Sequence, residues 1–278
     1  MIWFNILYFY CCFFALFPVI SFQALWVRKK ALRLPEPVGA REIPSEVEVE
    51  SEKQEAEQEA IQEAIQKPIK ILLTGDSAAA GVGVETQNDA LLGKLQQQLL
   101  SEDNTAASIC LLAKGGLASQ GVLELLQKEN PRRFDIAVVS IGVNDVTRFT
   151  SLKAWNTNVS LIYQLLVQKF GCKLVIFSGL PPMAEFPAIP QPLRYVLGLR
   201  AAMLNNALEK SLITLPFGRL LTVNLLNNNF HTYSHSVKRK PLLNANMMAI
   251  DGFHPSSAGY AIWAKQIVTL IRENNTPW

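Results

Sequence analysis

Four side chains in this sequence have the chemistry of acyl transfer: a serine, a histidine, an aspartate and an asparagine. Ser77 follows an apolar run, residues 69–74, at the point where a parallel strand would end. Asp251 and His254 are close enough in sequence for one short turn to hold them in a hydrogen bond, and Asn144 follows a second apolar run. A serine attacks an ester when an imidazole takes its proton, a carboxylate orients that imidazole, and an amide stabilises the oxyanion. The sequence therefore predicts a nucleophile, a base, an orienting group and an oxyanion donor.

Each of these residues also has an ordinary structural explanation. Ser77 could cap the helix that must follow the strand. Asn144 could form an Asx-turn in a polar loop, and Asp251 could form a turn before Gly252. The combination favours catalysis over these separate explanations. The chain lacks a G-x-S-x-G elbow and has its acidic residue just before the histidine, so the α/β-hydrolase arrangement is excluded.

Four segments of the chain resemble the marker blocks of the SGNH (GDSL-type) hydrolase family. They occur in the order of the family: Gly75-Asp76-Ser77, Gly116, Gly142-Val143-Asn144-Asp145 and Asp251-Gly252-Phe253-His254. The resemblance covers most of the chain, from about Ile69 to the C-terminal helix. Two positions depart from the family pattern. Ala78 stands where leucine is common, and the stretch just before Gly116, residues 112–115, contains no asparagine.

The resemblance implies a role for each of five residues. The catalytic residues are Ser77, Asp251 and His254, and the oxyanion donors are the backbone N–H groups of Ser77 and Gly116 and the side-chain amide of Asn144. Because two glycines adjoin, either Gly115 or Gly116 could be the backbone donor, and the spacing to a helix beginning near Ser119 favours Gly116. Asp76 and Asp145 are expected to hold their loops rather than to take part in the reaction.

Short apolar runs alternate with longer helical patterns through the rest of the chain. The expected strands are 69–74, 108–112, 136–141, 173–177 and 220–223, and the expected helices lie near 90–100, 120–128, 152–170, 194–212 and 256–271. Continuous apolar strands between helices indicate a parallel sheet covered on both faces. We therefore expect a three-layer α/β/α protein with a five-stranded parallel sheet, and the resemblance implies the flavodoxin-like SGNH hydrolase fold. Active sites of such sheets lie beyond the carboxyl ends of the strands, where Ser77, Gly116 and Asn144 fall.

The N-terminus predicts a transmembrane anchor. Residues 1–27 contain no charged side chain and are long enough to cross a bilayer. A cleaved signal sequence would begin with basic residues, whereas here the basic cluster at 28–33 follows the apolar run. The positive-inside rule then places the remainder of the chain on the cytoplasmic side.

The sequence thus divides into a transmembrane anchor (1–27), a basic and then acidic linker (28–67), and a hydrolase domain (68–278). The acidic part of the linker is rich in Glu, Gln and Ala and has no apolar stripe, which is typical of a solvated spacer. Near an anionic leaflet, its charge would hold the domain away from the lipid.

Composition gives no support for several other classes of function. The net charge of +3 gives no argument for nucleic acid binding. The four cysteines contain no CxxC pair, so neither a disulfide framework nor structural zinc is indicated, in agreement with a reducing compartment. His231 and His235 are four residues apart, but no third ligand is spaced with them. We therefore expect neither a metal nor a cofactor.

Together these features predict a membrane-tethered serine esterase or acylhydrolase that cleaves carboxylic or thio esters through an acyl-serine intermediate. Tethering favours lipid-derived esters, lysophospholipids or acyl thioesters as substrates. Two alternatives stay open: a carbohydrate O-acetyl esterase, and a catalytically silent membrane-tethered binding module. The proline-rich stretch 179–195 could form an apolar lip for an acyl chain or pack over the sheet, and the basic stretch 224–240 could be a flap or a solvated loop.

Overall fold

The centre of the protein is a six-stranded sheet with the order β1-β3-β2-β4-β5-β6. The computed structural model describes residues 2–44, 68–103, 106–223 and 245–274. The strands are β1 (Glu42–Ile43), β2 (Ile69–Gly75), β3 (Ala107–Ala113), β4 (Ile136–Ser140), β5 (Leu174–Ser178) and β6 (Gly218–Leu221). Strands β2 to β6 are parallel, and their order is that of flavodoxin-like proteins. This confirms the predicted α/β fold, to which β1 adds an unforeseen antiparallel edge strand on β3.

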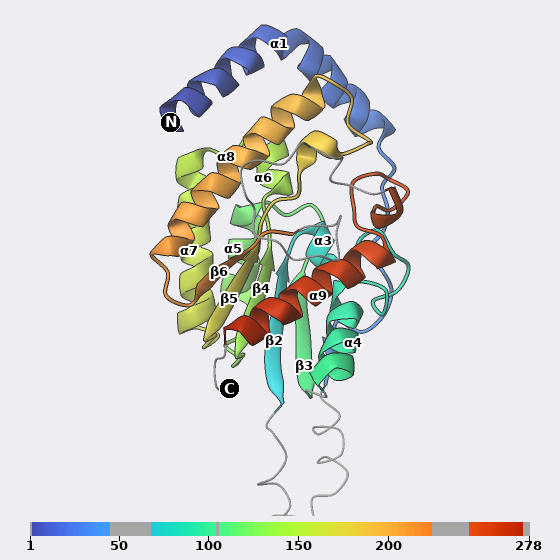
Figure 1. Ribbon diagram of the computed structural model, residues 1–278, viewed down its shortest axis with the longest axis vertical. Coiled ribbons are helices and arrows are strands. Elements are labelled where there is room, and N and C mark those ends of the chain that lie inside the picture. Colours follow the sequence, from blue (N-terminus) through green and yellow to red (C-terminus); the bar gives the residue numbers. More distant parts are fainter. Residues whose placement is uncertain (1, 45–67, 104–105, 224–244, 275–278) are drawn as a thin grey trace, which may run out of the picture.

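Helices cover both faces of the sheet, which gives the expected three layers (Figure 1). One face carries α3 (Ser77–Ala80), α4 (Leu91–Asp103) and α9 (Ser257–Glu273). The other carries α5 (Ser119–Lys128), α7 (Leu152–Gln168) and α8 (Leu193–Ile213). Shorter elements complete the described chain: α6 (Val143–Thr147), η2 (Met183–Glu185) and η3 (Ala245–Met247). All five predicted long helices are present, each within a few residues of its expected bounds.

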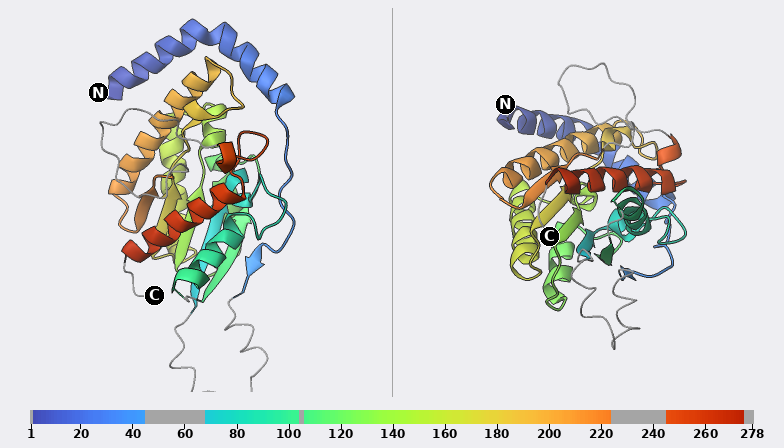
Figure 2. Two further views of the ribbon diagram at one scale, coloured as in Figure 1. Left: turned by 45° about the vertical axis from the view of Figure 1, so that its right-hand side comes forward. Right: turned by 60° about the horizontal axis from the view of Figure 1, so that its bottom comes forward.

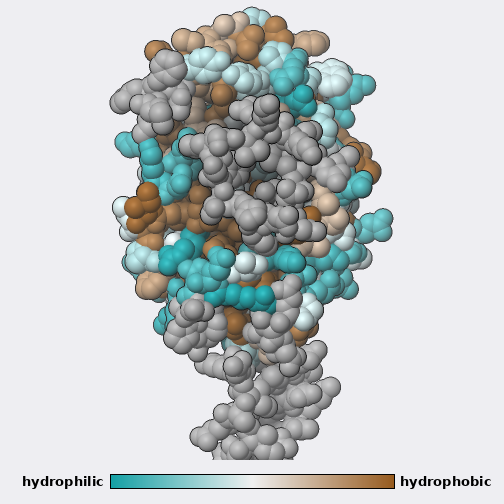
Figure 3. Space-filling view, viewed as in Figure 1, coloured by the Kyte–Doolittle hydropathy of each residue, from teal (hydrophilic) through white to brown (hydrophobic). Residues whose placement is uncertain are grey.

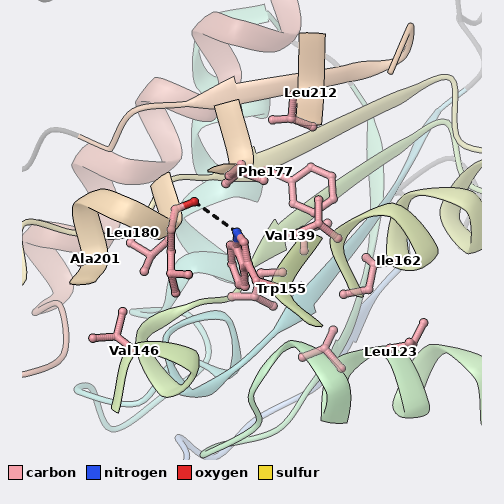
Figure 4. Packing of buried hydrophobic residues seen from close by; sticks show 14 of the residues in the cluster. Leu123, Val139, Val146, Trp155, Ile162, Phe177, Leu180, Ala201 and Leu212 are labelled. Atoms are coloured by element: carbon pink, nitrogen blue, oxygen red, sulfur yellow. Dashed lines mark hydrogen bonds between the residues drawn. The ribbon is translucent and has the colours of Figure 1, made fainter. Parts of the chain in front are cut away.

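Apolar side chains on both faces explain why the strands read as continuous apolar runs. In β5, Val175 and Phe177 pack into one layer, whereas Ile176 packs into the other, and all three are fully buried. The first layer is centred on Trp155, whose indole N–H donates a hydrogen bond to the carbonyl of Leu204 at 3.1 Å (Figure 4). Because alternate residues face opposite layers, both sets must be apolar.

The central strands β2, β3 and β4 end at paired residues, so the loops that follow them begin next to one another. Gly75 at the end of β2 pairs with Ala113 of β3 on one side and with Ser140 of β4 on the other. β2 is also the strand at which the sheet order reverses direction, because β3 and β4 flank it. The loops that follow these three strands therefore leave the sheet side by side, at the position where α/β sheets bind ligands.

The N-terminal helix α1 (Ile2–Lys30) lies across the end of the molecule that carries the carboxyl ends of the strands (Figures 1 and 2). It is bent, contains Pro18, and packs on α8. Phe9 and Ile20 of α1 are buried, and Gln23 Oε1 accepts the N–H of Leu193 at 3.0 Å.

Most of α1 nevertheless exposes apolar side chains, which appear as brown atoms at the top of Figure 3. The most exposed of them are Leu7, Phe14, Phe17, Phe22 and Leu25. Within the described residues, Leu7–Lys30 is the one helix long and apolar enough to cross a membrane. N-terminal helices of this kind occur both as membrane spans and in signal sequences, so α1 is compatible with the predicted anchor.

Candidate active site

Local backbone geometry presents Ser77 at the end of β2. Gly75 has φ +151°, and a Cβ there would lie 2.1 Å from the carbonyl oxygen of Ser140, so the close contact between β2 and β4 requires glycine. Asp76 then acts as the N-cap of α3, since its carboxylate accepts the N–H of Ala78 at 3.1 Å. The alternative that Ser77 is the cap is therefore wrong. Its hydroxyl is available for other contacts.

The hydroxyl of Ser77 begins a hydrogen-bonded chain of three side chains. Its Oγ lies 2.8 Å from Nε2 of His254, and Nδ1 of the same imidazole lies 2.6 Å from Oδ2 of Asp251. The structure thus brings together residues that are 177 positions apart in sequence. The Asp251 side chain is 1% exposed and that of His254 is 22% exposed, so the carboxylate is shielded from water whereas the imidazole is accessible.

Asp251 is held as a carboxylate by its surroundings. Its Oδ1 accepts the backbone N–H groups of Phe253 at 2.9 Å and His254 at 3.1 Å. Burial by itself would raise the pKa of Asp251, but these hydrogen bonds and the one to the imidazole outweigh it and hold the pKa below its ordinary value. The charged form is the one that can accept Nδ1–H and stabilise an imidazolium.

The pKa of Asp76 is shifted in the opposite direction. Its side chain is 2% exposed, and burial raises its pKa from 3.8 to about 6, although the N–H of Ala78 and the nearby His254 favour the charged form. A group whose pKa is higher in the folded than in the unfolded state binds its proton more tightly when folded. Asp76 therefore favours folding at low pH, and this contribution is lost as the pH rises from about 4 to about 6.

Replacing Asp76 by asparagine should remove this pH dependence, because the amide oxygen can still cap Ala78 but does not titrate in this range. We expect the free energy of unfolding of the variant, relative to wild type, to be higher at pH 7 than at pH 4 by up to about 3 kcal/mol. Urea unfolding of the detergent-solubilised full chain at both pH values measures it. An equal difference at pH 4 and pH 7 would show that Asp76 does not carry the effect.

The loop after β3, residues 114–118, is called here the oxyanion loop. Gly116 has φ +79°, and no atom lies within 4 Å of the position that its Cβ would occupy. The N–H of the preceding Gly115 is already taken, because it donates to Oε1 of Glu36 at 2.7 Å. Among the described residues no partner of the Gly116 N–H is found. These observations support the expected choice of Gly116 as the backbone donor.

Two side chains of α6 and its C-cap hold the other end of the oxyanion loop. The Asn144 amide donates to the carbonyl of Leu117 at 3.0 Å, and Arg148 donates to the carbonyl of Gly116 at 2.8 Å. An amide has two N–H donors, so the contact with Leu117 leaves Asn144 one donor for a substrate. The buried Asp145 binds the N–H and hydroxyl of Ser119 at 2.8 and 2.6 Å, which matches the loop-holding role expected for it.

Sequence reasoning missed Glu36 and Arg148 as members of this site. Glu36 stands in a proline-rich polar segment that reads as a connection, and Arg148 is one of many surface cations. Neither position carries a local signal, since each contacts the oxyanion loop only after the chain has folded. His231, His235 and the stretch 224–240 lie outside the described residues.

The proline-rich stretch after β5 packs over the sheet instead of forming a lip. The four large apolar side chains that precede α8 are all buried in the core: Leu180, Met183, Phe186 and Ile189. The ring of Phe186 contacts that of Phe253, next to His254, with 6.3 Å between the centroids. Of the two alternatives for this segment, packing is the one that the structure shows.

Comparison with known proteins agrees with this geometry. Residues 73–262, more than half of the chain, match the model of the GDSL-like Lipase/Acylhydrolase family. A GDSL-like esterase of Mycobacterium tuberculosis is 24% identical over 213 residues, which make up 74% of this chain and 62% of that protein. The chain therefore spans less than two thirds of the length of this relative.

Solved structures show the same fold. The psychrotrophic esterase EstA from Pseudoalteromonas, in a structure inhibited by monoethylphosphonate, is 17% identical with a TM-score of 0.52, over 74% of this chain and 99% of that one. A lipase from a goat rumen metagenome is 16% identical with a TM-score of 0.50, over 72% of this chain and 96% of that one.

Proposed function

Because the chain belongs to the GDSL-like lipase/acylhydrolase family, we propose that it hydrolyses carboxylic or thio esters through an acyl-Ser77 intermediate. The observation that carries this proposal is the continuous chain of hydrogen bonds from Ser77 Oγ through His254 to the buried Asp251. A serine paired in this way with an oriented imidazole has the geometry of an activated nucleophile.

The reaction follows from these contacts in two halves. Ser77 Oγ attacks the ester carbonyl while Nε2 of His254 takes the hydroxyl proton, and the imidazolium then protonates the departing alkoxide or thiolate. Water next gives a proton to the same nitrogen and attacks the acyl carbon. The bond from the acyl carbon to Ser77 Oγ then breaks, the imidazolium returns its proton to Oγ, and the acyl group leaves as the acid. In both halves the oxyanion accepts hydrogen bonds from the N–H groups of Ser77 and Gly116 and from the Asn144 amide.

The position of α1 supports lipid-derived esters as the substrate class. Its exposed apolar side chains lie at the same end of the molecule as the carboxyl ends of the strands (Figure 1), so a membrane bound through α1 would face the site. Where α1 instead leaves the domain and spans the bilayer, Arg28, Lys29 and Lys30 in its last turn favour the cytoplasmic side for the domain. A reporter joined after Trp278 and accessible only from the opposite side would contradict this topology.

The direct test is a series of p-nitrophenyl esters from acetyl to palmitoyl, hydrolysed by the full chain in detergent micelles. We expect turnover with a preference for longer acyl chains. A preference for acetyl would instead indicate an O-acetyl esterase. A folded protein that neither hydrolyses any ester nor reacts with a fluorophosphonate would indicate a silent binding module and contradict the proposal.

Asn144 provides a separate test of the oxyanion donors. Asn144→Ala should lower kcat by roughly a hundredfold or more with little change in KM, because the lost hydrogen bond is made to the transition state. Thr147→Ala on the same helix is the matched control. The exposed Thr147 hydroxyl bonds to the carbonyl of Asn144 and to no other described residue, so its loss should leave kcat near wild type. An increase in KM alone would rule out the oxyanion role of Asn144.

A further inference from the structure

We propose that Glu36, in the segment between α1 and β1, is a positioning residue that holds the oxyanion loop in its reactive conformation. The proposal rests on the proposed function and extends it to a part of the chain outside the matched family region, residues 73–262. It concerns a carboxylate 79 positions before the glycine that it binds.

Glu36 and Arg41 together bind two backbone groups where β3 ends, the carbonyl of Ala113 and the N–H of Gly115. Oε1 of Glu36 accepts the N–H of Gly115 at 2.7 Å, and Oε2 pairs with Nη1 of Arg41 at 2.9 Å. Nη2 of Arg41 donates to the carbonyl of Ala113. The ion pair therefore bridges from the last residue of β3 to the first glycine of the oxyanion loop.

These contacts orient the peptide that carries the Gly116 N–H. Glu36 holds the peptide before it through the N–H of Gly115, and Arg148 holds the peptide after it through the carbonyl of Gly116. A peptide unit is planar, so fixing both neighbours restricts the dihedral angles that turn the unit between them. Hydrogen bonds to charged groups are the stronger class, which suits such a restraint.

The Glu36 carboxylate and Ser77 both lie beside Gly115. The position that a Cβ on Gly115 would occupy is 3.3 Å from Glu36 Oε1 and 3.9 Å from Ser77 Cβ. An isolated negative charge at this place would oppose the oxyanion formed beside Ser77. The pairing with Arg41 compensates that charge, so the carboxylate can hold the loop at a lower electrostatic cost.

Backbone hydrogen bonds fix the segment around Glu36 on the domain. Val38 donates to the carbonyl of Glu85 at 3.0 Å and accepts the N–H of Gln87 at 2.9 Å, while the carbonyl of Arg41 accepts the N–H of Leu111 at 2.7 Å. Glu36 is thus held by the domain itself, although it falls within the segment that the sequence predicts to be a linker. The segment that connects α1 to the domain therefore also contains the residue that binds the oxyanion loop.

The test compares Glu36→Ala with Glu42→Ala in the full chain. Glu42 is the matched control, because it lies in β1, close to Glu36 in sequence, and its carboxylate pairs with Arg132 but makes no described contact with the oxyanion loop. On p-nitrophenyl butyrate we expect Glu36→Ala to lower kcat by about tenfold with KM within about twofold, and Glu42→Ala to keep the wild-type kcat. Glu36→Asp, which retains the charge but has a shorter reach, should recover part of the loss.

A double-mutant comparison with Asn144→Ala shows whether Glu36→Ala lowers kcat by weakening the hydrogen bonds to the oxyanion. If it does, Glu36→Ala should cost clearly less than tenfold when Asn144 is already alanine, because the two residues support the same hydrogen bonds. Full additivity of the two losses, or an equal loss of kcat in Glu42→Ala, would overturn the positioning role.

Amide hydrogen exchange measures the restraint of the oxyanion loop independently of catalysis. In Glu36→Ala, peptides that contain the oxyanion loop should exchange faster than in wild type, while those that contain β4 should not change. If wild type shows no Ser77-dependent turnover, the proposed function fails, and unchanged exchange in the oxyanion loop would separately show that Glu36 does not hold it.

Discussion

Replacing Ser77 by alanine is expected to lower kcat for ester hydrolysis by about ten-thousandfold or more, the largest effect of any single change in this chain. The variant keeps the backbone N–H of residue 77 and loses only the hydroxyl that lies 2.8 Å from His254 Nε2. Because Asp76 provides the cap of α3, the hydroxyl is not needed for the helix. Initial rates on p-nitrophenyl butyrate, with circular dichroism to show that the fold is retained, measure the effect.

The control for this prediction is Ser257→Ala. This change also removes one hydroxyl, three residues from His254 in sequence. In the wild type, the Ser257 hydroxyl donates to Asp89 at 3.1 Å instead of contacting the imidazole. Ser257→Ala should keep wild-type turnover and react with a fluorophosphonate, whereas Ser77→Ala should do neither. Equal labelling of wild type and Ser77→Ala would place the nucleophile elsewhere.

Asp251→Asn is expected to lower kcat by about a thousandfold or more without loss of the fold. The two backbone N–H groups at Oδ1 require an oxygen there, so the amide nitrogen must take the place of Oδ2 and point at Nδ1 of His254. An amide nitrogen only donates, and it therefore selects the imidazole tautomer whose proton is on Nε2. That tautomer donates to Ser77 and cannot accept its proton.

Asp89→Asn is the matched control for the change at Asp251. The Asp89 carboxylate contacts Lys94 and Thr86 and lies outside the hydrogen-bonded chain of the site. It should retain turnover and KM near wild type. If Asp251→Asn kept kcat within a few fold of wild type, the imidazole would not need Asp251 to set its tautomer, and the proposed role of this carboxylate would be wrong.

Glu36 has a consequence for how the domain can be isolated. A chain that begins at residue 68 would lack Glu36, Arg41 and β1, and with them the contacts to Gly115 and Leu111. We expect such a fragment to be a weaker esterase than the full chain even where it folds. The boundary predicted at residue 68 stays a prediction for the domain, while the segment before it contacts β3 and the oxyanion loop through Glu36, Arg41 and β1.

Local sequence was enough to predict the five parallel strands, the long helices and the residues proposed for catalysis. Each of these is encoded over a few positions: an apolar run for β2, a glycine and an aspartate before Ser77, and an aspartate three residues before His254. Strand and helix periodicity, turns and caps are short-range properties of the chain. The same alternation of strands and helices also implied that the site lies at the carboxyl ends of the strands.

Only the tertiary structure decided which glycine N–H is free, what holds the oxyanion loop, and that the apolar residues after β5 are buried. The contacts Glu36–Gly115 and Arg148–Gly116 join positions 79 and 32 residues apart, and β1 pairs two residues of a polar segment with β3. Such contacts arise where separate elements meet, so no spacing along the chain encodes them. The sequence by itself determined which groups are proposed to react, whereas packing determined how the groups around them are held, because a side chain's neighbours depend on the whole fold.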